Sequence, residues 1–208
     1  MLIQWCLKGI PERLGEPGEP DFGDAEARAA VDRVGLRSTW LRRQGGAASG
    51  LPSLAQPVLS QPALDAHVNG FAPGAPTPYL SLSAGATEID PVSGAALRTS
   101  ALQTALGFAT GNGRCDGYVF RLWTLVSPKP AAELAGFAEE VRDLNLFRQF
   151  TPWHHEGEIA AKLYVPARQI ESVTKYSAGL APLWSPPAYG NPAVFVPPER
   201  ISTIVAEV

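Results

Sequence analysis

The sequence predicts an α+β fold, in which strand-like and helix-like segments follow one another along 208 residues. Some segments alternate apolar and polar residues or concentrate β-branched and aromatic residues, which is typical of strands. Others place apolar residues at helical spacing. The 20 glycines and 20 prolines favour short elements joined by many turns over a helical bundle.

Composition limits the class of protein. Apolar residues make up 45% and charged residues 18%, which is typical of a globular chain. A net charge of -3 gives no basic surface for nucleic acid or for an anionic membrane. We expect a single domain over residues 1–208, with the flank 1–36 as its least certain part. Cys6 and Cys115 form neither a CxxC motif nor a Cys/His metal spacing.

The amino-terminal residues carry no targeting signal that we recognise. MLIQWCLKGIPERLG lacks a basic start, a long apolar core and a small-residue cleavage site. No apolar run approaches the length that spans a membrane. We therefore expect a soluble protein, either cytoplasmic or delivered into a target cell without a signal peptide.

The first third of the chain predicts a strand, a helix and a second strand. LIQWCLK, residues 2–8, reads as a strand that Gly9 and Pro11 stop. AEARAAVDRVG reads as a helix that Asp24 caps and Gly35 ends. LRSTWLRRQ, residues 36–44, reads as a strand that carries three arginines: Arg37, Arg42 and Arg43.

A long loop, residues 45–78, follows, with a helical turn expected at ALDAHVNGF. PYLSLSAG then predicts a strand in which Tyr79, Ser81 and Ser83 share one face, because side chains alternate at period two. The remaining elements are expected in this order: a helix TSALQTALGFAT, a strand GYVFRLWTLV, an amphipathic helix AAELAGFAEEVRDLN and a strand EGEIAAKLYVP.

The last of these strands carries two carboxylates, Glu156 and Glu158, two residues apart. On a strand they would point to the same side, with Cα atoms roughly 7 Å apart. Like charges held so close repel each other, and such a cost usually persists where chemistry uses it. Gly157 between them would leave room for a ligand. The alternative is an exposed strand edge with two solvated acids.

Neighbouring segments offer complementary groups. Trp153 supplies an apolar surface just ahead of the two acids, and serine hydroxyls can orient both a carboxylate and a bound sugar. Arginine is suited to holding a diphosphate through paired hydrogen bonds.

The order of these motifs resembles the mono-ADP-ribosyltransferases of the cholera-toxin-like, Arg-Ser-Glu type. That order is Arg42 in TWLRRQ, Ser81 and Ser83 in PYLSLSAG, then Glu156 and Glu158 behind TPWHH. The resemblance covers roughly residues 37–175. It implies two facing mixed or antiparallel β-sheets that form an NAD cleft flanked by helices, with NAD as co-substrate and no metal.

The resemblance also implies roles on the NAD side of the site. Glu158 would hydrogen-bond the nicotinamide ribose and stabilise an oxocarbenium-like transition state. Ser81 would hold Glu158 and touch the ribose, Ser83 would support the strand, and Arg42 would grip NAD. Arg37 or Arg43 could replace Arg42, and the LKG segment at the amino terminus could be an eroded first strand.

On the acceptor side, the resemblance implies that Glu156 positions or deprotonates a protein side chain, an arginine, while Trp153 meets the acceptor. The target protein is not named by the sequence, and a neutralising partner is expected if the chain is a toxin. His154 and His155 read as solvated turn residues rather than zinc ligands. Two alternatives stay open: an NAD glycohydrolase, and a catalytically silent binding module that uses the TPWHH turn.

Overall fold

The computed structural model describes most of the chain. The residues described are 2–15, 19–44, 59–70, 76–89, 96–127, 131–141 and 157–195. The predictions for Trp153, His154, His155 and Glu156 therefore lie outside the described residues.

A six-stranded antiparallel sheet forms the centre of the fold, in the order β10-β9-β6-β1-β3-β7. Its strands are β1 (Leu2–Pro11), β3 (Tyr79–Ser83), β6 (Gly117–Val126), β7 (Glu158–Lys162), β9 (Ile170–Tyr176) and β10 (Ala188–Gly190). Two small sheets pair β2 (Leu36–Arg37) with β8 (Tyr164–Val165) and β4 (Ala86–Ile89) with β5 (Ala96–Thr99).

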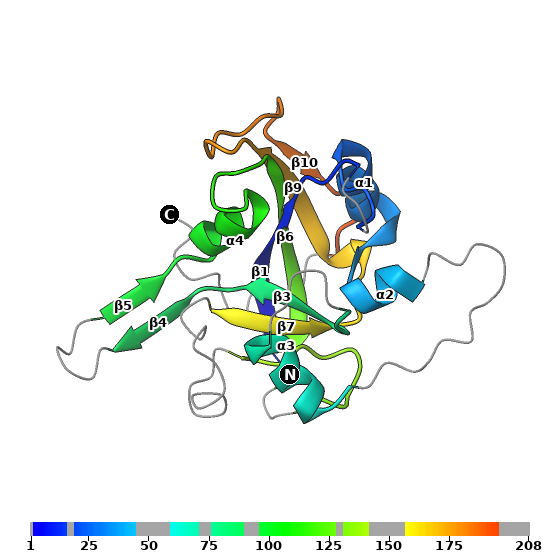
Figure 1. Ribbon diagram of the computed structural model, residues 1–208, viewed down its shortest axis with the longest axis vertical. Helices are drawn as coiled ribbons and strands as arrows, with labels where there is room; N and C mark the ends of the chain where they lie inside the picture. Colours follow the sequence, from blue (N-terminus) through cyan, green and yellow to red (C-terminus); the bar gives the residue numbers. More distant parts are fainter. Residues whose placement is uncertain are drawn as a thin grey trace.

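Helices flank this sheet (Figure 1). They are α1 (Asp24–Ala29), which continues as a π-helical segment (Ala30–Val34), α2 (Thr39–Gln44), α3 (Gln61–Asn69) and α4 (Ala101–Ala109). The α+β class is thereby confirmed. No helix in the described ranges is long and apolar enough to cross a membrane.

The large sheet consists of two blocks that meet at one residue pair. β1 pairs with β6 along its whole length, from Leu2 to Pro11, whereas it pairs with β3 only at Leu7 and Ser83. In Figure 1, β3 and β7 run across the view while β1 and β6 run up it. We call the Leu7–Ser83 pair the crossing. The amino-terminal segment thus supplies an interior strand.

The two faces of the sheet are covered by different helices. α1 and its π-helical continuation pack on one face, where Ala27 and Val31 join a core with Phe120 and Ile159. α4 packs on the other face so closely that a Cβ on Gly9 would lie 2.0 Å from a backbone oxygen of α4. Gly9 therefore lies inside β1, so the prediction that the strand stops there is wrong, whereas Pro11 is the last residue of the strand, as predicted.

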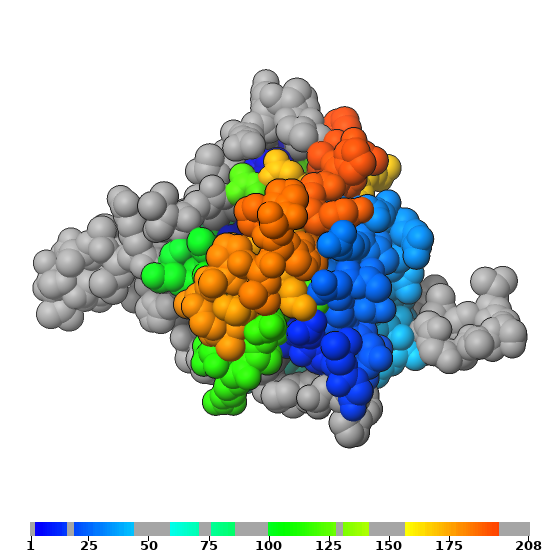
Figure 2. Space-filling view, turned by 90° about the horizontal axis from the view of Figure 1, so that it is seen from above, coloured from blue at the N-terminus to red at the C-terminus, as the bar shows by residue number. Residues whose placement is uncertain are grey.

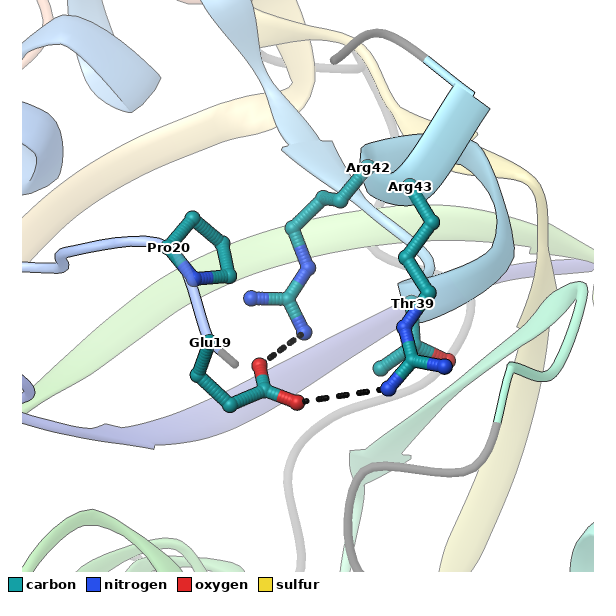
Figure 3. A pocket seen from close by; sticks show the side chains of 5 residues that line it. All are labelled: Glu19, Pro20, Thr39, Arg42 and Arg43. Atoms are coloured by element: carbon teal, nitrogen blue, oxygen red, sulfur yellow. Dashed lines mark ion pairs between the residues drawn. The ribbon is translucent and has the colours of Figure 1, made fainter. Parts of the chain in front are cut away.

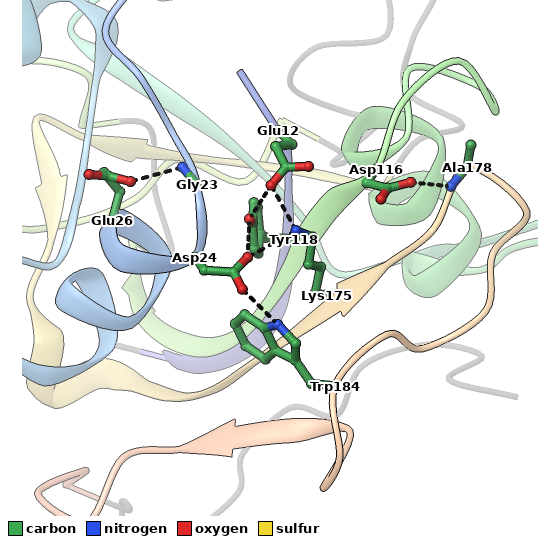
Figure 4. A network of polar contacts seen from close by, with 9 residues as sticks. All are labelled: Glu12, Gly23, Asp24, Glu26, Asp116, Tyr118, Lys175, Ala178 and Trp184. Carbon is green, nitrogen blue, oxygen red and sulfur yellow. Dashed lines mark hydrogen bonds and ion pairs between the residues drawn. The ribbon is translucent and has the colours of Figure 1, made fainter. Parts of the chain in front are cut away.

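Asp24 begins α1 but does not cap it, contrary to the prediction. The N-cap is Gly23, whose N–H donates to Glu26 Oε2 at 2.9 Å. Asp24 instead accepts hydrogen bonds from Tyr118 Oη at 2.7 Å and Lys175 Nζ at 2.9 Å (Figure 4). Burial acts to raise the pKa of Asp24, but these donors outweigh it and hold the pKa below its usual value.

The same carboxylate fastens the carboxyl-terminal part of the described chain. Asp24 Oδ2 accepts from Trp184 Nε1 at 3.2 Å, and the guanidinium of Arg28 lies 4.9 Å from the ring centres of both Trp184 and Tyr189. Figure 2 shows the two segments, blue and orange, side by side on one face of the molecule. α1 therefore contacts β6 and β9 through Asp24 at its first residue, and contacts Trp184 and Tyr189 through Asp24 and Arg28.

The strand predicted for residues 36–44 is wrong. Only Leu36 and Arg37 are extended, and α2 begins at Thr39. Ser38 Oγ accepts from the Leu41 N–H at 3.2 Å, as an N-cap serine does. The leucine, arginines and glutamine that follow are good helix formers, so local preference and capping together outweigh the strand reading.

The amphipathic helix predicted from residue 131 is also wrong over 131–141. Glu139 pairs with Ala160 of β7 through two backbone hydrogen bonds of 2.9 Å. The side chain of Lys162, 0% exposed, donates to Glu139 Oε1 at 2.7 Å and to two carbonyls of this segment, Ala131 at 2.6 Å and Leu134 at 2.8 Å. A buried ammonium needs such partners, and their positions are incompatible with a helix.

Gly157 is required by a close approach of backbone to backbone. Its φ is +62°, and a Cβ on it would lie 2.3 Å from the carbonyl carbon of Gly85. Its carbonyl accepts from the Ala84 N–H at 2.9 Å. The glycine between the two acids is thus required by its contact with Gly85, which follows β3. Because this φ interrupts the strand, the alternation of side chains does not extend from Glu158 back through Gly157, and it cannot be used to place Glu156 on the same side.

We predict that Gly157→Ala destabilises the protein by more than about 3 kcal/mol, since it adds a backbone clash to the strain of a positive φ. Gly136→Ala is the matched control, because Gly136 has a φ of +89° and open space around it. The control should lose only about 1–2 kcal/mol. Urea unfolding followed by circular dichroism measures both, and equal losses would contradict the contact with Gly85.

Candidate functional site

Three polar side chains from three elements meet beside the crossing: Ser81 of β3, His67 of α3 and Glu158 of β7. His67 Nε2 lies 3.1 Å from Ser81 Oγ and 3.4 Å from Glu158 Oε1. The side chains of His67 and Glu158 are only 4% and 9% exposed. The carboxylate is therefore held almost out of water, next to a histidine.

Pairing of β3 with β7 puts these groups in register. Ser83 is the partner of Glu158, Ser81 of Ala160 and Tyr79 of Lys162, so all lie on one face, as predicted for the three β3 residues. Ser83 is buried directly across from Glu158.

α3 brings His67 to this face. The helix is capped by Ser60, whose Oγ accepts from the Ala63 N–H at 3.3 Å. Leu64 and Val68 pack against Tyr79 in one hydrophobic cluster, and His67 lies on the same side of the helix at helical spacing. The apolar contacts thus determine where the imidazole sits.

Glu158 has an oxygen without a hydrogen bond. Oε1 is shielded from solvent and accepts no hydrogen bond from the described residues, because its 3.4 Å contact with His67 does not meet hydrogen-bond geometry. A buried acceptor left unsatisfied costs about 1–3 kcal/mol. Such an atom is suited to receive a donor from a ligand.

Ser81 is linked to the Glu158 carboxylate only indirectly, by way of His67. It hydrogen-bonds His67, and no hydrogen bond joins it to Glu158 within the described part of the chain. Ser81 is also more exposed than His67 or Glu158.

A second cluster is basic. Arg42 and Arg43 of α2 both face Glu19, at 3.9 and 3.7 Å, and these three residues line a cavity of about 120 Å³ with Thr39 and Pro20 (Figure 3). Burial lowers the pKa of Arg42, the charge of Arg13 lowers it further, and Glu19 opposes them. Positive charge is thus in excess here.

Several donors in the basic cluster have no partner. Arg42 Nε and two guanidinium nitrogens of Arg13, Nε and Nη2, are buried without a hydrogen bond to the described residues. Guanidinium groups match the oxygens of phosphates in planar, paired geometry. The cluster can therefore accept an anion that is larger than one carboxylate.

Lys8 follows the crossing residue Leu7 on β1. Burial lowers the pKa of Lys8 to about 8, with the charge of Glu158 opposing this and those of Arg42 and Arg13 adding to it. The charges of both clusters therefore act on one ammonium group. Lys8 belongs to the LKG segment, which the sequence suggested as an eroded first strand.

Sequence reasoning missed His67 and gave Lys8 no role. A histidine on the apolar face of a capped helix was the available signal for His67, and a lysine in a strand of buried residues was the signal for Lys8. Among the residues that the structure describes, no three or more histidines, cysteines or acids gather where they could hold a metal ion.

No protein-family model matches the chain, and no curated protein matches it. Among solved structures, the chain is similar to the A subunit of heat-labile enterotoxin, in an arginine-to-lysine mutant with great flexibility of an active-site loop. The identity is 13%, the alignment covers 91% of this chain and 75% of that chain, and the TM-score is 0.47. A likeness this distant assigns neither residues nor an activity.

We predict that Lys8 titrates near pH 8, well below the ordinary lysine value of about 10.4. Glu158→Gln should lower the pKa of Lys8 further, whereas Arg42→Ala should raise it, since each removes a charge that acts on the ammonium. The chain has four lysines, so ¹³Cε resonances followed through a pH titration resolve them, with Lys8→Arg as the assignment control. Titration of Lys8 at its ordinary value would contradict this placement.

Proposed function

We propose that the chain transfers ADP-ribose from NAD to an arginine side chain of a protein and releases nicotinamide. The observation that carries the proposal is the unsatisfied, buried oxygen of Glu158 beside His67 and Ser81. The order of the sequence motifs, which resembles the Arg-Ser-Glu transferases, gives this carboxylate its proposed partner, a ribose hydroxyl.

The residues present fit NAD at two places. The unsatisfied oxygen of Glu158 can accept a hydrogen bond from the ribose, and the unpaired guanidinium nitrogens of Arg13 and Arg42 can donate to the diphosphate. Lys8 adds a positive charge. An anion that enters the arginine cluster would compete with Glu19 for Arg42.

The chemistry requires a fixed negative charge. When the bond between ribose and nicotinamide breaks, nicotinamide leaves with the bonding electrons and positive charge develops on the ribose. A carboxylate already held in place and shielded from water stabilises that charge without reorganisation. His67, which is hydrogen-bonded to Ser81, lies 3.4 Å from Glu158 and is the polar group beside this charge. The acceptor nitrogen then attacks the ribose carbon and loses a proton, for which Glu156 is the proposed base.

Water instead of arginine as acceptor would make the chain an NAD glycohydrolase. Both reactions use the same NAD-binding half of the site, so the geometry around Glu158 does not separate them. They differ in the need for Glu156 and for an acceptor.

We predict that Glu158→Gln lowers nicotinamide release by about 10²–10³-fold, the usual cost of removing one preorganised electrostatic group. Nicotinamide is measured by chromatography with and without an arginine-like acceptor, and circular dichroism checks the fold. Release that depends on Glu158 and rises with the acceptor supports transfer. No release from the wild type under either condition would favour the silent binding module.

We predict that Glu156→Gln abolishes labelling of the acceptor while nicotinamide release continues, because the amide cannot take the acceptor's proton. Mass spectrometry of an arginine-containing peptide measures the label, and release is followed in the same reaction. If both activities persist, the acceptor role of Glu156 is wrong; if both disappear, Glu156 acts in the first step.

A further inference from the structure

Thr77, just ahead of β3, contacts the second ring nitrogen of His67. Thr77 Oγ1 lies 3.0 Å from His67 Nδ1 and accepts a hydrogen bond from the Tyr79 N–H at 3.2 Å. On the opposite side of the ring, Nε2 faces Ser81 and Glu158. The imidazole is thus held at both nitrogens by groups of known donor and acceptor capacity.

These contacts, together with the nearby carboxylate, favour one position of the ring proton. A hydroxyl has one proton to donate, and Thr77 has no other acceptor for it within the described residues. Donation to Nδ1 requires that nitrogen to be unprotonated, which puts the proton on Nε2. The reverse tautomer would place an unprotonated nitrogen 3.4 Å from Oε1 of Glu158, which is repulsive when the carboxylate is ionised.

Thr77 is itself held in place by α2. Its N–H donates to Thr39 Oγ1 at 2.9 Å, and its carbonyl accepts from the Trp40 N–H at 3.1 Å and from Thr39 Oγ1 at 3.3 Å. α2 is the helix that carries Arg42. The Thr77 residue whose hydroxyl contacts His67 is therefore held by hydrogen bonds from its own backbone to Thr39 and Trp40 of α2.

We propose that Thr77 is a positioning residue that holds the neutral His67 ring in its Nε2–H tautomer, with this N–H donated to Ser81 beside Glu158. The tautomer is a property of the folded chain alone. Its contribution to catalysis rests on the function proposed for Glu158.

The test that is independent of activity is long-range ¹H–¹⁵N correlation spectroscopy of the histidine rings, with NAD absent. The chain has three histidines, and His67→Gln identifies the signals of His67. At a pH where the ring is neutral, we expect the pattern of the Nε2–H tautomer in the wild type. The Nδ1–H pattern would overturn the proposal without the need for any variant.

Two variants test Thr77 itself. Thr77→Val keeps the shape but removes the hydroxyl, whereas Thr77→Ser keeps the hydroxyl. We expect a mixture of tautomers in Thr77→Val and the wild-type pattern in Thr77→Ser. A wild-type pattern in a folded Thr77→Val would overturn the role of Thr77. If Thr77→Val does not fold, Thr77→Ser remains decisive, since a changed tautomer in this variant would also contradict the proposal.

Nicotinamide release gives the functional readout. We expect Thr77→Val to lower kcat by about tenfold with KM unchanged, in the range of one net hydrogen bond between neutral groups, and Thr77→Ser to remain near wild type. A loss confined to KM would contradict a role through Glu158. Absence of release from the wild type would refute the proposed function and leave the tautomer result standing.

Discussion

The single backbone pair between Leu7 and Ser83 is the constraint on which the site depends. β1 continues along β6 while β3 turns away with β7, so the two blocks of the sheet separate directly after this pair. Lys8 follows Leu7 on one block, and Glu158 faces Ser83 on the other. The crossing therefore places an ammonium group within the electrostatic influence of a carboxylate that is 150 residues away in the sequence.

Glycines make this arrangement possible at two places. Gly157 lets the chain enter β7 in contact with the backbone after β3, and Gly9 lets α4 lie directly on β1. A side chain at either position would separate elements that hold the crossing. Precise placement of Glu158 thus depends on residues that have no functional group of their own.

Strong local patterns predicted much of the fold from the sequence. The strands at LIQWCLK, PYLSLSAG and GYVFRLWTLV and the helix ALQTALGFA are confirmed, because period and residue preference agree with burial there. Residues 131–141 were mispredicted because the buried Lys162 ammonium needs hydrogen-bond partners from this segment, and these contacts outweigh the helical pattern of its sequence.

The site residues were likewise predicted only in part. Ser81 and Glu158 belong to motifs that can be recognised in the sequence. His67 is placed by the packing of α3, and Lys8 by the crossing, and neither placement is visible in the sequence alone. The roles of Glu156 and Trp153 stay predictions.

The contact between Glu139 and Ala160 has a consequence for the solubility of the folded chain. β7 is the last strand of the large sheet, and an uncovered edge strand invites pairing with another molecule. The bridge at Glu139 occupies backbone groups on that edge, and the buried Lys162 ammonium anchors the covering segment. β7, the strand that carries Glu158, is thereby protected from edge-to-edge aggregation. Lys162 thus has two effects: it holds residues 131–141 in a non-helical conformation, and it keeps this segment on the edge of β7.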